Sequence, residues 1–171
     1  MLNQIKICNN LANSTKYDLV TMPINKTIFM REIKFIGMTE YLGILNKKTT
    51  AMLMYGDKFS IIPITTHINI KKVHKYLKSK YINTFLKNIL KSLTKANGSK
   101  FFDEINFLCY NPHCGEDGFL GLEDIIIKKN IKKFKQIKGP FSADSSFGNI
   151  KKNTLFISTY HDQALIPFKI M

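Results

Sequence analysis

Three of the four histidines stand just after apolar runs that are typical of β-strands. His67 follows IIPITT, His113 follows INFLCYNP and His161 follows TLFISTY. Because open α/β sheets collect ligands at the carboxyl ends of their strands, we expect the three imidazoles to lie at one edge of a sheet. Neutral imidazoles that converge there would bind zinc or a similar divalent cation at about 2.0–2.1 Å and leave positions open for a substrate. The competing interpretation is three hydrogen-bonded loop histidines, because no local spacing motif links them.

Carboxylates in loop-like stretches form a second set of candidates. Four of them have glycine or proline nearby, namely Glu40, Glu116, Asp144 and Asp162. Beside metal-binding histidines, such a side chain would orient an imidazole or hold a substrate amine. Helix capping or solvation explains any one of them equally well. Glu123 and Asp124 stand at the start of a predicted helix, where they favour its dipole.

Three common enzyme fingerprints are absent from the sequence, which contains no GxGxxG, GxxxxGK[ST] or GxSxG pattern. A nucleotide cofactor is therefore not held in the Rossmann manner, and we assign no cofactor-binding residues.

Alternating strand and helix patterns would position these side chains. The runs TTAMLMY (49–55) and FSIIPIT (59–65), separated by a turn-like Gly-Asp-Lys, predict two neighbouring strands. Apolar residues at three- and four-residue spacing after His67 predict one long helix or two in series. The remaining predictions are a short strand at 17–23, strands at 105–110 and 153–159, and a helix at 122–137 that Gly139-Pro140 closes. Strand-helix alternation of this kind indicates the α/β class.

The charge and cysteine content narrow the class of protein. The 171 residues carry a net charge of +14, but 25 of the 26 basic residues are lysines and Arg31 is the single arginine. Base reading and bidentate phosphate binding favour arginine, so we interpret the lysines as solvated positions and expect no nucleic-acid partner. Cys8, Cys109 and Cys114 lack CxxC spacing and predict reduced thiols. The absence of a long apolar run predicts no membrane span and a cytoplasmic location.

Four stretches together resemble one enzyme family. They are GMTEYL (37–42), ITTHINI (64–70), NPHCGEDGFLG (111–121) with GPFSADSSF (139–147), and YHDQALIPFK (160–169). In type and order they are similar to the motifs of the 4-hydroxythreonine-4-phosphate dehydrogenases of vitamin B6 biosynthesis. The resemblance implies a three-layer α/β/α sheet, related to the isocitrate and isopropylmalate dehydrogenases. This chain, as a single α/β region over residues 1–171, would match the central part of the family's two-domain chain and be incomplete at both ends.

The resemblance also implies roles for individual residues. The family's metal ligands fall on His67, His113 and His161, and are shared across a homodimer, with His161 reaching the partner's site. Its substrate-binding residues fall on four positions, Met38, Thr39, Asp144 and Lys169.

The activity implied is an NAD(P)-dependent oxidation of 4-phosphohydroxy-L-threonine. A divalent cation, Zn, Mg or Co, lowers the pKa of the substrate's secondary hydroxyl, and hydride leaves the same carbon for NAD. The resulting 2-amino-3-oxo acid loses carbon dioxide to give 3-amino-2-oxopropyl phosphate.

Departures from the family pattern leave alternatives open. Met38 stands where the family has a histidine, and a thioether donates no hydrogen bond. Asp117 and Ala164 replace glycines, and a positive φ at Ala164 would add strain. An active dehydrogenase is thus one interpretation, a non-catalytic remnant that keeps metal binding is the second, and a basic nucleic-acid-binding module is the weakest.

Overall fold

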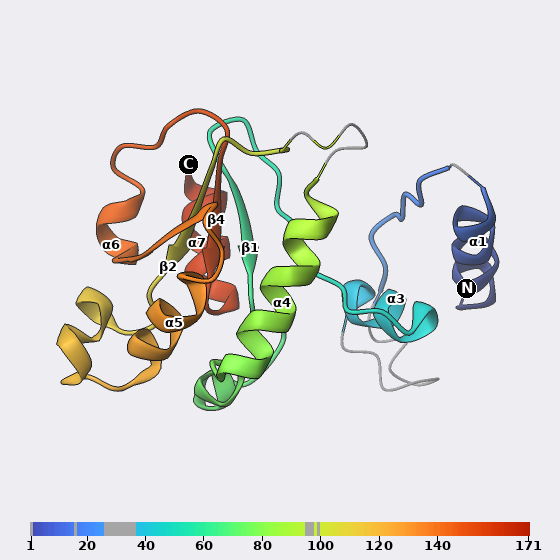
Figure 1. Ribbon diagram of the computed structural model, residues 1–171. Helices are drawn as coiled ribbons and strands as arrows, with labels where there is room; N and C mark the ends of the chain where they lie inside the picture. The colour runs from blue at the N-terminus through green and yellow to red at the C-terminus, as the bar shows by residue number, and fades with distance from the viewer. Residues whose placement is uncertain (1, 16, 26–36, 95–97, 99) are drawn as a thin grey trace. The chain divides into compact units, whose positions relative to one another are not determined.

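The computed structural model describes residues 2–15, 17–25, 37–94, 98 and 100–171 (Figure 1). The chain divides into two compact units, residues 1–50 and residues 51–171, and each is described by itself. Among the described residues, none of the helices combines the length and apolar character needed to span a bilayer.

The first unit contains two helices, α1 (Leu2–Ser14) and α3 (Met38–Asn46). Asn46 at the end of α3 exchanges two side-chain hydrogen bonds with Asn9 of α1, at 3.1 and 2.8 Å. Tyr41 of α3 is buried, and the partly buried apolar residues around it are Ile5, Ile24, Met38 and Leu45.

The strand predicted at 17–23 is wrong. Residues 17–25 have no regular secondary structure, and Val20 and Met22 are 88% and 79% exposed. A strand needs a neighbour for its backbone N–H and C=O groups, and within the described part of the chain none pairs with this run.

The second unit is built on a sheet of four parallel strands. In spatial order these are β1 (Ser60–Pro63), β4 (Thr154–Ser158), β2 (Glu104–Leu108) and β3 (Ile137–Phe141). All five residues of β4 are buried, because this strand lies inside the sheet with helices on both faces.

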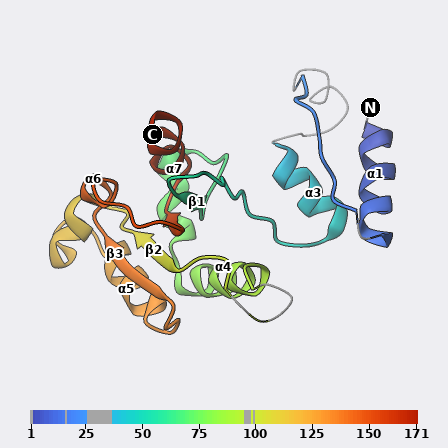
Figure 2. The same ribbon diagram turned by 90° about the horizontal axis from the view of Figure 1, so that it is seen from above.

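Helices cover both faces of this sheet, which confirms the predicted α/β class. Figure 2 shows α4 (Ser79–Ser92) and α7 (His161–Ile170) on opposite sides of the strands. On one face, residues such as Phe107 and Ile157 pack with the apolar sides of α4 and of α5 (Glu123–Ile131). On the other, Phe156 and Leu108 pack with Ala164 of α7 and with residues around the short α6 (Ala143–Ser146).

Helix α4 forms where the sequence places apolar residues at helical spacing. Ile82, Phe85, Leu86 and Ile89 recur every three or four residues and are all buried. A 3-10 helix, η1 (Ile70–Tyr76), precedes it, so the two helices in series are confirmed. A second 3-10 segment, η2 (Pro112–Gly118), separates β2 from α5.

Three other predictions needed correction. Residues 49–55 form no full strand, and only Met54 makes an isolated antiparallel bridge, to Ile61. Gly139-Pro140 does not merely close a helix but lies inside β3, the last strand of the sheet. A proline is tolerated there because one side of the strand has no partner among the described residues. The stretch after Tyr160 is the helix α7 rather than a loop, with Pro167 inside it.

Candidate functional site

The carboxyl edge of the sheet gathers the segments that carry the three predicted histidines. His67 follows β1, His161 follows β4 and His113 follows β2, and these strands are neighbours in the order β1-β4-β2. The rings of His67 and His161 have centroids 5.4 Å apart, tilted by 44°. The expected placement at one edge of the sheet is therefore confirmed for the three segments.

The spacing of this pair fits two ligands of one ion. A tetrahedral zinc with Zn–N bonds of about 2.0–2.1 Å holds two imidazole centroids about 5 Å apart, close to the observed 5.4 Å. Within the described residues of a single chain, however, no three His, Cys, Asp or Glu side chains form a group that would hold a metal. The structure brings His67 and His161 together, and His113 does not complete a three-ligand cluster with them.

His113 begins a left-handed turn of the backbone. Residues 113–117 all have positive φ, between 46° and 77°, and only Gly115 among them is a glycine. Such a conformation costs roughly 1–2 kcal/mol for each residue with a side chain, so neighbouring contacts must hold the turn in place. Asp117 has a φ of 53° and lies in this strained region. Ala164 lies in α7 without a positive φ, so the strain considered for that position does not arise.

Asp124 anchors the start of this turn. Its carboxylate is 2% exposed and accepts hydrogen bonds from the backbone N–H groups of Tyr110 and Asn111 at 2.7 and 2.9 Å. The side chain of Asn111 donates a third, at 3.0 Å. Asp124 lies in the first turn of α5, as predicted, but its hydrogen bonds go to the segment that leads to His113.

Gln163 connects two strand ends at the same edge. Its Oε1 accepts from the backbone N–H and the hydroxyl of Thr159, at 2.7 and 2.8 Å. Its Nε2 donates to the carbonyl oxygen of Cys109 at 2.7 Å. Thr159 also accepts from the hydroxyl of Thr65 at 2.7 Å. Sequence reasoning assigned no role to these residues, although a glutamine at the third position of a helix is a known signal for a bond back to the residues before it.

Asp162 contacts the imidazole of His161 directly. Nδ1 of the ring lies 2.7 Å from Oδ1 of Asp162. An ionised carboxylate only accepts hydrogen bonds, so the proton in this contact belongs to Nδ1, and in the neutral ring Nε2 then carries the lone pair. The pair thus presents His161 in the tautomer that a metal ligand requires.

The two expected substrate-binding residues of the second unit, Asp144 and Lys169, lie on different helices, α6 and α7. Asp144 is exposed in α6, and the hydrogen bond from Ser142 lowers its pKa, with a smaller contribution from nearby His113. Lys169 is exposed near the end of α7, eight residues after His161, which corresponds to about 12 Å along a helix axis.

Met38 and Thr39 open helix α3 in the first unit. The Thr39 carbonyl accepts from the hydroxyl of Thr50 at 2.9 Å, and Met38 packs near Tyr41. Glu40 also belongs to this helix rather than to a loop.

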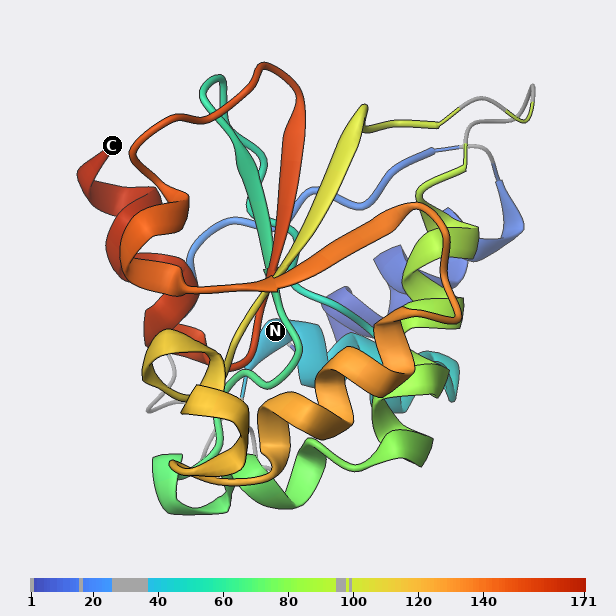
Figure 3. The same cartoon turned by 60° about the vertical axis from the view of Figure 1, so that its left-hand side comes forward.

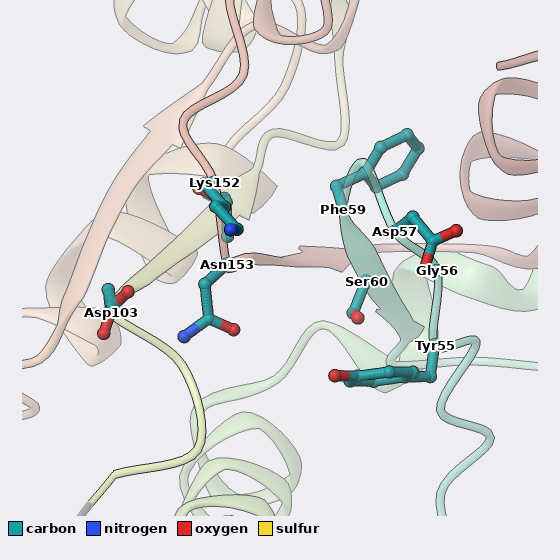
Figure 4. Close-up of a pocket in the computed structure, with 9 residues that line it drawn as sticks. Tyr55, Gly56, Asp57, Phe59, Ser60, Asp103, Lys152 and Asn153 are labelled. Carbon is teal, nitrogen blue, oxygen red and sulfur yellow. The ribbon is translucent and has the colours of Figure 1, made fainter.

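Among the described residues, two of the pockets lie beside the sheet. The smaller, about 230 Å³, lies beside the left-handed turn and is lined by His113, Asp117, Asp124 and Lys128 among others. The larger, about 500 Å³, lies at the opposite edge, where β1, β2 and β4 begin. Figure 4 shows Tyr55, Ser60, Asp103 and Lys152 around it. The larger of these two pockets therefore does not lie at the edge of the sheet that carries the histidines.

The three cysteines are free thiols, as predicted. Burial and the adjacent thiol of Cys109 raise the pKa of Cys114 to about 12, so its thiolate is scarce at neutral pH.

Comparison with known proteins gives a consistent picture. The family model of pyridoxal phosphate biosynthetic protein PdxA matches residues 1–171. A 4-hydroxythreonine-4-phosphate dehydrogenase of Hydrogenobaculum sp. is 37% identical over 155 residues, covering 90% of this chain and 49% of that protein. One from Aquifex aeolicus is 35% identical, covering 91% and 50%.

A solved structure supports the same likeness. The crystal structure of a 4-hydroxythreonine-4-phosphate dehydrogenase from Burkholderia phymatum superimposes with a TM-score of 0.71 at 27% identity, covering 97% of this chain and 53% of that one. The chain thus spans about half the length of the curated relatives it matches.

Proposed function

Because the chain belongs to the PdxA family of pyridoxal phosphate biosynthetic proteins, we propose that it serves as a metal-dependent dehydrogenase in that pathway. The reaction is the NAD-dependent oxidation of 4-phosphohydroxy-L-threonine to a 2-amino-3-oxo acid, which decarboxylates to 3-amino-2-oxopropyl phosphate. The observation that carries the proposal is that the segments of His67, His113 and His161 follow three neighbouring parallel strands and so meet at the carboxyl edge of the sheet. The proposal includes a cytoplasmic location, and NADP as an alternative to NAD.

The metal site of this proposal uses His67, His113 and His161. Zinc, magnesium and cobalt are the candidate ions, and imidazole ligands favour zinc or cobalt over magnesium. A homodimer that shares ligands between subunits would account for the lack of a three-ligand cluster within the described part of one chain. Bound there, the cation would polarise the substrate hydroxyl and stabilise its deprotonated form.

The chain's own residues would orient the two partners of the reaction. Asp162 fixes the tautomer of His161 through the 2.7 Å contact with Nδ1. Lys169 would bind an anionic end of the substrate, while Thr39 and Asp144 would donate to or accept from its polar groups.

Met38 favours a second candidate function, a remnant that binds metal without turnover. A thioether at this position donates no hydrogen bond, so one substrate contact implied by the family pattern is lost. The two candidates share the metal site and differ in the chemistry that follows.

One experiment separates them. The purified protein is incubated with cobalt or zinc, NAD and 4-phosphohydroxy-L-threonine, and NADH formation is followed by absorbance. We expect turnover that depends on added metal and is abolished in the His113→Ala variant. The matched control is His74→Ala, because His74 is exposed in η1 and lies outside the proposed site.

Each outcome has a definite meaning. Stoichiometric metal binding that His113→Ala abolishes, without NADH formation, would identify the remnant. If the wild-type chain binds neither cobalt nor zinc, both candidates are wrong.

A further inference from the structure

We propose that Gln163 is a positioning residue that sets the geometry of the metal site by joining the strand ends that carry its histidines. The inference rests on the proposed function, since it concerns the same metal site. The residues involved would contact neither substrate nor metal. They would act by holding the backbone segments that precede the three histidines.

The side-chain amide of Gln163 takes part in three hydrogen bonds. Oε1 accepts two hydrogen bonds from Thr159, and Nε2 donates one to the carbonyl of Cys109, all between 2.7 and 2.8 Å. The orientation of the amide is fixed, because a flip would set N–H against N–H and oxygen against the carbonyl. One side chain therefore joins the end of β4 to the end of β2.

Thr159 extends the connection to the third segment. It is fully buried, and its carbonyl accepts from the hydroxyl of Thr65, itself 3% exposed. Thr65 stands two residues before His67, Thr159 two before His161, and Cys109 four before His113. Figure 3 shows the strand ends in question, with α7 leaving β4 at this edge. We call Thr65, Cys109, Thr159 and Gln163 the edge network.

Burial makes the edge network specific for glutamine. Thr159 and Cys109 are 0% and 2% exposed, so a lost bond leaves a polar group without water to replace it. A glutamate at 163 keeps an acceptor for Thr159 but turns an oxygen towards the Cys109 carbonyl. A methionine has a similar length and removes both contacts.

The consequence for the metal is a change in the separation of its ligands. Bonds of about 2.0–2.1 Å tolerate little displacement, and loss of an outer contact that orients a ligand lowers metal affinity about 10- to 100-fold. Asp162 fixes the tautomer of His161, whereas the edge network fixes where the three histidine segments stand relative to each other.

The test measures cobalt binding by the full chain, without turnover. Titration with Co²⁺, followed by its visible absorption spectrum, gives the affinity and reports the coordination geometry. We expect Gln163→Met to raise the dissociation constant about 10- to 100-fold and to change the spectrum. Gln163→Glu should also weaken binding, because a carboxylate oxygen then faces the buried Cys109 carbonyl instead of an N–H donor. The control is Gln136→Met, in the turn before β3 at the opposite edge of the sheet, which should leave both unchanged.

A second pair of variants tests the edge network independently, in case Gln163→Met does not fold. Thr65→Val removes only the hydroxyl that contacts Thr159, and Thr65→Ser restores it. We expect weaker cobalt binding in the first and recovery in the second, with circular dichroism showing that both are folded.

The outcomes distinguish the two proposals. If the wild-type chain binds Co²⁺, His161→Ala abolishes binding, and Gln163→Met and Thr65→Val bind within twofold of wild type with the same spectrum, the edge network has no positioning role and the metal site stands. If the wild-type chain binds no Co²⁺, the proposed function is wrong and the inference falls with it.

Discussion

Replacing Asp124 by asparagine should destabilise the second unit strongly. The Asp124 carboxylate is 2% exposed and accepts three hydrogen bonds, two of them from backbone N–H groups. An asparagine keeps one acceptor oxygen and turns an NH₂ group towards the other donors. The variant therefore loses at least one charge-assisted bond, worth about 1.5–3 kcal/mol, and leaves a buried N–H unpaired at a cost of about 1–3 kcal/mol. We expect a total loss of about 2.5–6 kcal/mol.

The assay is urea unfolding followed by circular dichroism, because the chain contains no tryptophan for fluorescence. At a slope of about 2 kcal/mol per molar urea, a loss of 3 kcal/mol lowers the midpoint by about 1.5 M. The matched control is Glu123→Gln at the preceding position, whose single contact, with Asn111 Nδ2, is 3.4 Å long. That control should change stability by less than about 0.5–1 kcal/mol.

The reasoning is refuted if Asp124→Asn costs no more than Glu123→Gln. Equal losses would mean that the three short contacts of Asp124 contribute nothing beyond those of an ordinary acidic residue in a first helical turn.

Three further predictions follow from single features. Asp117→Gly should raise the free energy of unfolding by about 0.5–1 kcal/mol, since glycine relieves the strain at φ of 53° and loses part of that gain to chain entropy. Hydrogen bonds from Lys138 and Lys151 are the main cause that lowers the pKa of the Glu104 carboxyl. The stability that these bonds contribute is present above the ordinary glutamate pKa of about 4.3. It is lost as the pH falls through the lower pKa of the folded state. Glu104→Gln should therefore lower the melting temperature more at pH 7 than at pH 3. A thiol reagent at pH 8 should label exposed Cys8 fast, and buried Cys109 and half-buried Cys114, whose pKa is raised, slowly.

Each of these has a clear check. Asp103→Gly, at a residue without positive φ, should destabilise where Asp117→Gly stabilises; a loss for both would exclude strain at Asp117. Equal shifts of Glu104→Gln at the two pH values would show that Lys138 and Lys151 do not couple to its ionisation. For the thiols, a fast phase that persists in Cys8→Ser would contradict the assignment.

Local sequence patterns determined the inner part of the fold. The predicted run 105–110 covers β2 except for its first residue, Glu104, and the runs 153–159 and 59–65 contain β4 and β1. Strands that are buried on both faces are recognisable as apolar runs. Helical spacing located α4 and the start of α5 for a similar reason, since their buried faces repeat every three or four residues. The histidine positions after these strands followed from the same runs.

Elements at the margins were decided by tertiary contacts. Residues 137–141 become a strand only because β2 offers them a partner, although their Gly-Pro pair is typical of a helix end. Helix α7 forms around a proline because buried Ala164 packs against the sheet. Conversely, the apolar run at 17–23 found no strand to pair with among the described residues.

For the candidate site too, some features followed from the sequence and others only from the tertiary structure. The sequence by itself determined which side chains stand at the carboxyl edge. The apolar runs locate the strands along the chain, and the residues that follow each run are known directly from the sequence. Only the tertiary structure decided that His67 faces His161, that Asp124 holds the turn of His113, and that Gln163 joins two strand ends. Those contacts link residues up to 94 positions apart, as between Thr65 and Thr159, and distances of that kind are set by the packing of the whole sheet.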